Sequence, residues 1–184
     1  MAVTAYRHFA TLSSTTRTGG SVAWTNPGNA GASDNTYATS TITTATETHW
    51  LWGENAGFTT SDVPTGSTIL GFEVSFERKV LNGPTGFSGQ ATTYYNAVKS
   101  SALHGTEKQT VNTPTGSDTN EVVGGAADLW GGTFTDADVI ATTTGVAIAF
   151  GDTLHNGVTI SADDIQIRWY YTPPNTRRNG GSFM

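Results

Sequence analysis

Apolar and polar residues alternate with a period of two in three stretches of the chain, residues 69–80, 144–151 and 164–172. A period of two is the pattern of a β-strand with one buried face, whereas a helix stripe repeats every three to four residues. The pattern therefore predicts three strands that line a core. Their expected inner faces are Leu70, Phe72, Val74 and Phe76, then Val146, Ile148 and Phe150, then Ile165, Ile167, Trp169 and Tyr171.

Shorter segments rich in β-branched and aromatic residues lie between clusters of Gly, Pro and Asn, which are turn residues. Residues 136–140 differ, because Thr135 as N-cap and acids in the first turn predict one turn of helix. The Asn156-Gly157 pair predicts a type I′ hairpin turn. Many short strands at even spacing are typical of an antiparallel β-sandwich, and we expect an all-β, jelly-roll-like fold. The further strands are expected over residues 5–12, 21–24, 37–43, 47–52, 91–99, 107–111 and 158–160.

The length and the C-terminal tail indicate how the chain is organised. Its 184 residues suit one domain, and no change in composition marks an internal boundary. Residues 1–174 are therefore expected to form a single β-sandwich domain. Pro173-Pro174 prevents further β pairing, so residues 175–184 are expected to form an irregular C-terminal arm. Residues 1–5 are expected to form a similar arm at the other end.

Composition limits the partners of the protein. The net charge is −6, and nucleic acid is not expected as a partner because phosphate binding needs a basic stripe. No apolar run approaches the roughly 18 residues of a membrane helix, so no membrane contact is expected either. The chain has no Cys, which excludes disulfides and thiolate metal sites. Charged residues are only 13%, and Lys is depleted from protein–protein interfaces. This composition suits a protein that contacts copies of itself. It suits an ordinary neutral β domain equally well.

The titratable residues form no catalytic or metal-binding pattern. No histidine has a second one two to four residues away, and His49, in a strand-like run, is expected to be structural. Asp163-Asp164 favours capping of a strand start, and Asp34 favours an Asx turn over metal ligation. There is no nucleophile elbow, Walker loop or zinc-protease motif. We expect no enzymatic activity, no cofactor and no metal. The remaining histidines are His8, His104 and His155.

Trp50 and Trp52 are two residues apart and are expected to share one face of a strand, with His49 and Leu51 on the other. If the tryptophan face were open to solvent, it would form a platform for sugar stacking or an anchor for a partner subunit. The interpretation we favour is that both rings belong to the core.

Four segments along the chain carry distinctive sequence motifs. They are WTNPGNAGASDNTYA at residues 24–38, VPTGSTILGFEV at 63–74 with ERK at 77–79, GGAADLWG at 124–131, and DIQIRWYYTP at 164–173. Trp130 in the third segment is expected to plug one end of the sandwich. Gly124, Gly125 and Gly131 would supply positive φ or close backbone approach around it.

This order resembles a family of phage and prophage virion structural proteins, over about residues 20–174. The resemblance implies an antiparallel β-sandwich in a virion, as a head decoration or as a tail or appendage subunit, and it implies no catalytic residues.

We therefore expect a non-enzymatic component of a tailed-phage particle, assembled in the host cytoplasm. A capsid decoration or cement protein is the first interpretation, binding the major capsid protein and itself as a homo-oligomer, with a trimer favoured by capsid geometry. The arms would bridge neighbouring subunits. The alternatives are a tail, baseplate or fibre protein and a carbohydrate-binding, lectin-like module. The candidate partner-binding residues are Arg177, Arg178, Phe183, Trp50 and Trp52.

Overall fold

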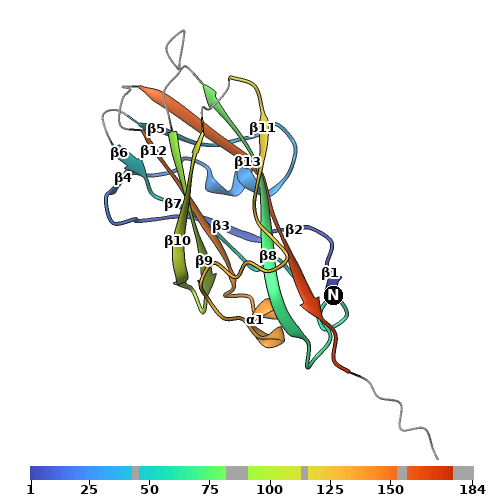
Figure 1. Cartoon of the computed structure of the whole chain (residues 1–184). Coiled ribbons are helices and arrows are strands. Elements are labelled where there is room, and N and C mark those ends of the chain that lie inside the picture. The colour runs from blue at the N-terminus through green and yellow to red at the C-terminus, as the bar shows by residue number, and fades with distance from the viewer. Residues whose placement is uncertain (43–45, 82–90, 113–115, 153–156, 176–184) are drawn as a thin grey trace, which may run out of the picture.

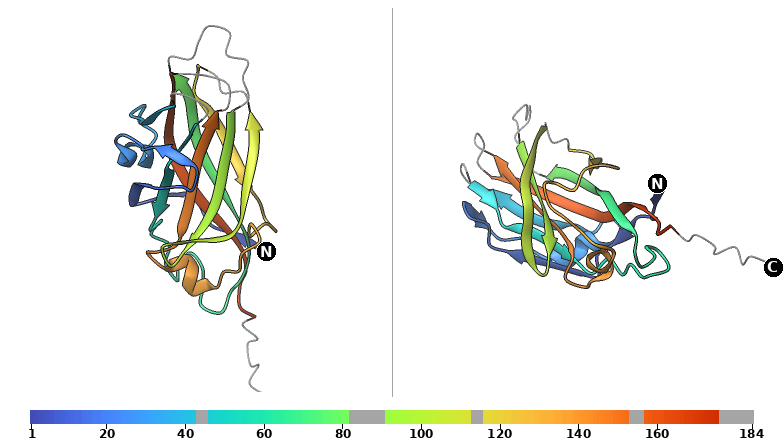
Figure 2. Two further views of the ribbon diagram at one scale, coloured as in Figure 1. Left: turned by 90° about the vertical axis from the view of Figure 1, so that its left-hand side faces the viewer. Right: turned by 60° about the horizontal axis from the view of Figure 1, so that its bottom comes forward.

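The computed structural model describes residues 1–42, 46–81, 91–112, 116–152 and 157–175. In these residues two β-sheets face each other, and the expected all-β antiparallel β-sandwich is confirmed (Figures 1 and 2). The helical elements are a 3-10 helix, η1 (Pro27–Gly31), and α1 (Asp136–Ile140). The strands are β1 (Ala2–Val3), β2 (Arg7–His8), β3 (Thr11–Thr15), β4 (Gly20–Val22), β5 (Ala38–Ile42), β6 (Thr46–Thr48), β7 (Trp50–Glu54), β8 (Thr68–Leu81), β9 (Ala91–Lys99), β10 (Ala102–Asn112), β11 (Thr119–Gly124), β12 (Gly145–Asp152) and β13 (Val158–Thr172).

The first sheet, sheet A, has β13 at its centre. One side of β13 pairs with β8 along nearly its whole length. Its other side pairs in succession with β5, β2 and β1. Beyond β8 lies β11, so the strand order is β1-β13-β8-β11. Strands β1 and β11 therefore lie at opposite edges of sheet A.

The second sheet, sheet B, is built around β12. Strand β9 lies on one side of β12, while β7 and β6 share the other side. Strand β3 extends the sheet beyond β7, and β4 beyond β6, where the pairing is parallel. In the described part of the chain β10 pairs only with β9, so it forms an edge of sheet B.

The predicted apolar faces pack between the two sheets. Phe72, Val74 and Phe76 of β8 are buried in one core cluster with the predicted inner faces of β12 and β13. Leu70 is the exception, because the pairing of β8 with β13 shifts there and Ile69 enters the core in its place. A bulge adds one residue to a strand and so changes which side chains face inward.

A second bulge explains why β13 looks like two strands in the sequence. Its register with β8 shifts between Asp163 and Gln166, and Asp164 has a φ of 52°. Before the bulge Val158, Ile160 and Ala162 face the core, and after it the odd-numbered residues do. The expectation that Asp163-Asp164 caps a strand start is therefore wrong, since β13 begins at Val158.

Two other expectations need correction, and one strand was not expected. The strands on either side of Asn156-Gly157 lie in different sheets, so no hairpin pairs them; residues 153–156 lie outside the described part. The expected strand over 5–12 is two strands in different sheets, β2 and β3. Strand β11 was not predicted, because apolar and polar residues do not clearly alternate in this part of the sequence.

The N-terminal segment is docked on its own sheet and is not an irregular arm. Ala2 and Val3 pair with Tyr171 and Tyr170 of β13. Thr4 is buried; its backbone N–H donates to the Trp169 carbonyl at 3.0 Å, and its hydroxyl accepts from the Trp169 N–H at 2.9 Å. Met1 and Val3 present large exposed apolar side chains at this end.

Candidate functional site

A cleft of about 240 Å³ lies where the edge of sheet B meets the edge of sheet A. Tyr95 of β9 and Trp130 are at its base, and Lys108 and Thr110 of β10 lie opposite Val123 of β11. Strands β10 and β11 belong to different sheets, so no backbone ladder closes the gap between them. The described part of the sandwich is therefore open along this seam.

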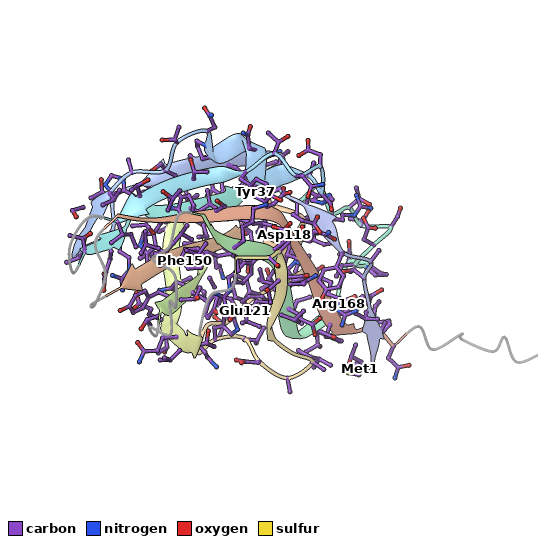
Figure 3. All side chains as sticks on the ribbon, turned by 90° about the horizontal axis from the view of Figure 1, so that it is seen from above. Met1, Tyr37, Asp118, Glu121, Phe150 and Arg168 are labelled. Carbon is purple, nitrogen blue, oxygen red and sulfur yellow. The ribbon has the colours of Figure 1, made fainter. Side chains whose placement is uncertain are left out.

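The cleft stands on a buried polar network centred on Glu121. This side chain projects from β11 toward sheet B (Figure 3). One carboxylate oxygen accepts from Arg78 Nε at 2.6 Å. The other accepts from the Thr110 hydroxyl at 2.7 Å and from the Tyr95 hydroxyl. Burial, followed by the hydrogen bond to Glu121, raises the pKa of Tyr95. Tyr95 therefore stays protonated at physiological pH and acts as a fixed donor.

The loop that carries Trp130 is held in place by its backbone. Trp130 is fully buried in the core, with its ring centroid 4.5 Å from that of Phe72. Its own φ is 51°, and Gly124 and Gly131 also have positive φ, as expected. A Cβ on Gly124 would lie 2.3 Å from the Phe72 carbonyl, so only glycine fits. Gly125 has no such constraint, contrary to expectation.

The mouth of the cleft is crossed by an exposed ion pair. Lys108 Nζ lies 2.8 Å and 3.0 Å from the two carboxylate oxygens of Asp128. Asp128 is itself fixed, because its Oδ1 accepts the Trp130 backbone N–H at 2.9 Å. The cleft therefore presents a cation and an anion side by side in a defined geometry.

Trp50 and Trp52 lie on the outer face of sheet B but are covered. They are only 2% and 8% exposed and pack in a small cluster with Val98, Ala147 and Ala149. The favoured core-like interpretation is confirmed, and an open tryptophan platform is absent from the described structure.

Arg17 covers part of this face. Its guanidinium carbon lies 5.0 Å from the Trp50 ring centroid and 4.1 Å from the Tyr94 ring centroid. Ion pairs with Glu47 and, at 2.9 Å, with Glu107 hold it there. Arginine between two aromatic rings is a favourable stacking arrangement, so the side chain is a stable cover for Trp50.

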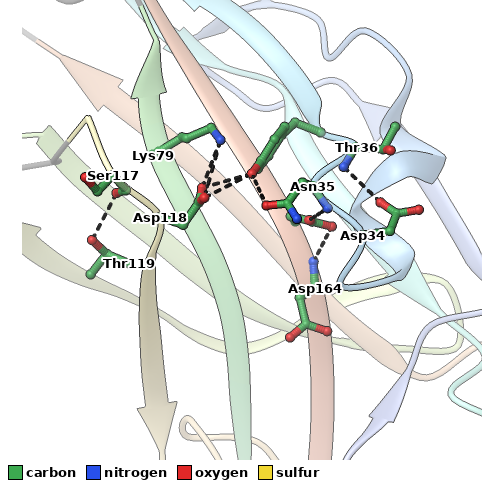
Figure 4. Close-up of polar contacts among 10 residues, drawn as sticks. Asp34, Asn35, Thr36, Lys79, Ser117, Asp118, Thr119 and Asp164 are labelled. Atoms are coloured by element: carbon green, nitrogen blue, oxygen red, sulfur yellow. Dashed lines mark hydrogen bonds and ion pairs between the residues drawn. The ribbon is translucent and has the colours of Figure 1, made fainter.

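A polar cluster lies on the outer face of sheet A (Figure 4). The Tyr37 hydroxyl donates to Asp118 at 3.1 Å, and Lys79 Nζ lies 3.6 Å from the Tyr37 ring centroid. Asp34 accepts the Thr36 N–H at 2.9 Å, which confirms the expected Asx turn. Asp163, almost fully buried, accepts the Asn35 N–H at 3.1 Å.

The acidic residues of this cluster influence each other. Burial raises the pKa of Asp163, and the neighbouring Asp34 and Asp164 add to the effect. Burial, with the charges of Asp118, Asp163 and Asp164, raises the pKa of Glu77. In the described residues no three His, Asp or Glu side chains are arranged to hold a metal ion.

The histidines make local contacts. His49 is half-buried, and its Nδ1 lies 3.3 Å from the Ser14 hydroxyl, in line with a structural role. His104 accepts the Thr133 N–H at 3.0 Å and packs on Phe134. His8 pairs with Asp164 at 2.7 Å. His155 lies outside the described residues, as do the candidate partner residues Arg177, Arg178 and Phe183.

No helix in the described part of the chain is long and apolar enough to span a membrane. The cleft residues were missed in the sequence because they come from four separate segments. The glycines and Trp130 of the GGAADLWG motif were the one available signal.

No family model and no curated protein matches the chain. Among solved structures, the chain is similar to the CBM22-1 xylan-binding domain of Paenibacillus barcinonensis Xyn10C, at 14% identity and a TM-score of 0.41, covering 91% of this chain and 94% of that one. It is also similar to a CBM4 structure at 11% identity and a TM-score of 0.41, covering 89% and 94%. A third is the N-terminal cellulose-binding domain of Cellulomonas fimi β-1,4-glucanase C, at 11% identity and a TM-score of 0.38, covering 88% and 86%. Similarities at this level assign no residue and no ligand to this chain.

Proposed function

We propose that the protein is a non-enzymatic structural component of a tailed-phage particle, and that it decorates the capsid. The order of its four sequence motifs, which resembles phage structural proteins, supports this proposal.

The observation that carries the proposal is the placement of the two chain ends. Strand β1 lies beside the last residues of β13, so Met1 and the start of the C-terminal segment lie at the same end of the molecule (Figure 3). Met1 and Val3 are 79% and 49% exposed there. An exposed apolar edge strand can be extended by a partner chain. We propose that this end of the molecule contacts the particle and other copies of the protein.

The proposed mechanism is physical. A protein that binds the assembled particle and not its dissociated subunits stabilises the particle by mass action. The docked edge at β1 would supply apolar contact. Arg177 and Arg178, which lie outside the described residues, would meet acidic or carbonyl-rich surface of the particle. No bond is made or broken in this account.

Two variants test the proposal. Deletion of residues 175–184, or Val3→Asp in β1, should abolish binding to particles that lack the protein. Val111→Asp is the matched control, because Val111 is a similarly exposed valine on β10. Co-sedimentation measures binding, and circular dichroism checks that each variant is folded. If both folded variants bind the particles fully, the proposal that this end of the molecule docks on the particle is refuted. Binding to tails and not heads would support the tail, baseplate or fibre alternative.

A carbohydrate-binding role is the second candidate, and one observation favours it. The cleft between β10 and β11 is a preformed hollow with both apolar and polar lining. This role would use the cleft instead of Trp50 and Trp52, whose rings are covered.

A further inference from the structure

We propose that the cleft between β10 and β11 binds a single neutral sugar ring. The proposal rests on the carbohydrate-binding candidate and specifies its ligand. It does not depend on the particle role, since β11 lies at the edge of sheet A opposite to β1. A protein docked through β1 would therefore leave the cleft available to a saccharide.

The charge of the cleft favours a neutral ligand. Its lining contains one cation, Lys108, and one anion, Asp128, and these are paired with each other. An anionic ligand such as a phosphate could contact Lys108 only by approaching the negative charge of Asp128. A cationic ligand could contact Asp128 only by approaching the positive charge of Lys108. A hydroxyl group both donates and accepts, so adjacent hydroxyls of a sugar can bind the ammonium and the carboxylate together.

The lining suits the mixed surface of a sugar. Val123 faces the cleft between Glu121 and Gly124 and supplies apolar contact for the C–H groups of a ring, while Lys108 and Asp128 supply the polar contacts. The size sets the length of the ligand. Pockets for drug-sized ligands are about 300–1,000 Å³, so a cleft of about 240 Å³ holds one ring and not an extended chain.

The polar groups are fixed before any ligand arrives. Asp128 is oriented by the Trp130 N–H, and Trp130 is in turn held where its carbonyl accepts the Thr106 N–H at 2.7 Å. The network around Glu121 holds Tyr95 and Thr110 at the base. Preorganised groups lower the entropy cost of binding, which matters for a ligand as small as one ring.

The test is an NMR titration of the full chain with the methyl glycosides of glucose, galactose, mannose and N-acetylglucosamine. We expect at least one glycoside to produce saturable shifts that centre on the backbone amides of Lys108, Gln109 and Asp128 and on the Trp130 indole. No saturable shift with any of the four, or shifts that centre elsewhere, would overturn the proposal. Shifts that depend on protein concentration alone would also overturn it, because the cleft would then be an interface between copies.

Variants separate a specific site from a general effect. Lys108→Ala should weaken the binding of the active glycoside at least tenfold. Lys99→Ala removes the same charge from another Lys–Asp pair, with Asp138, outside the cleft, and should bind like the original protein. Equal affinity for the sugar in both variants would contradict the assignment. Particle binding by Lys108→Ala should stay unchanged, so failure here is distinct from failure of the proposed function.

Discussion

Replacing Glu121 with Ala tests the buried network beneath the cleft. The Arg78 side chain is only 6% exposed, and Glu121 is its ion-pair partner at 2.6 Å. Removing one member of a buried pair leaves an uncompensated charge and typically costs about 3–5 kcal/mol. The Tyr95 and Thr110 hydroxyls lose an acceptor but retain each other at 2.5 Å, so we add nothing for them. We therefore expect Glu121→Ala to lower the free energy of unfolding by about 3–5 kcal/mol.

The assay is urea unfolding followed by tryptophan fluorescence, with circular dichroism as a second probe. A domain is usually stable by about 5–15 kcal/mol, so the loss would be a large fraction of the total. The double variant Arg78→Met with Glu121→Leu removes both charges and should recover at least half of the loss. The reasoning is refuted if Glu121→Ala costs less than about 1 kcal/mol, the range of an exposed pair.

Three further predictions concern local features of the fold. Gly124→Ala places a Cβ 2.3 Å from the Phe72 carbonyl at a φ of 94°, so the unfolding midpoint in urea should fall by an amount equivalent to about 1–3 kcal/mol; an unchanged midpoint would contradict the close contact. Thr135→Ala removes the side chain that accepts the Asp138 N–H at 3.2 Å, and thermal unfolding should show a loss of about 1 kcal/mol; no loss would mean that the capping box is not formed. Glu77 has a raised pKa in the folded state, so its charge opposes folding once pH exceeds the ordinary value of about 4.3. Glu77→Gln should therefore stabilise the protein at pH 7 by less than about 1 kcal/mol, with no difference near pH 3, and the reverse pH dependence in urea titrations would refute the assignment.

Alternation along the sequence predicts the core because β8, β12 and β13 each bury one face against the other sheet. Phe72, Phe150 and Trp169 occupy the interior for this reason. The helical turn at α1 is also predictable, since Thr135 and Asp138 form a capping box through local contacts alone. Such features depend on neighbours within a few residues.

The pairing of distant segments is what sequence reasoning cannot supply. The bulge at Asp164 changes the phase of β13, and its position depends on β8 across the ladder. The cleft is harder still, because Lys108 and Asp128 meet only after two edge strands from different sheets come together. Trp50 shows a third case, in which a long-range contact with Arg17 decides whether an aromatic ring is open or covered.

The most direct test of the proposed particle role is to look for the protein on purified tailed-phage particles released by cells that carry its gene. Antibody labelling with electron microscopy, together with mass spectrometry of the particles, gives the answer. We predict label on the capsid surface in many copies per head, lost when residues 175–184 are deleted. Particles free of the protein, with the protein present only in the lysate, would contradict the proposed function.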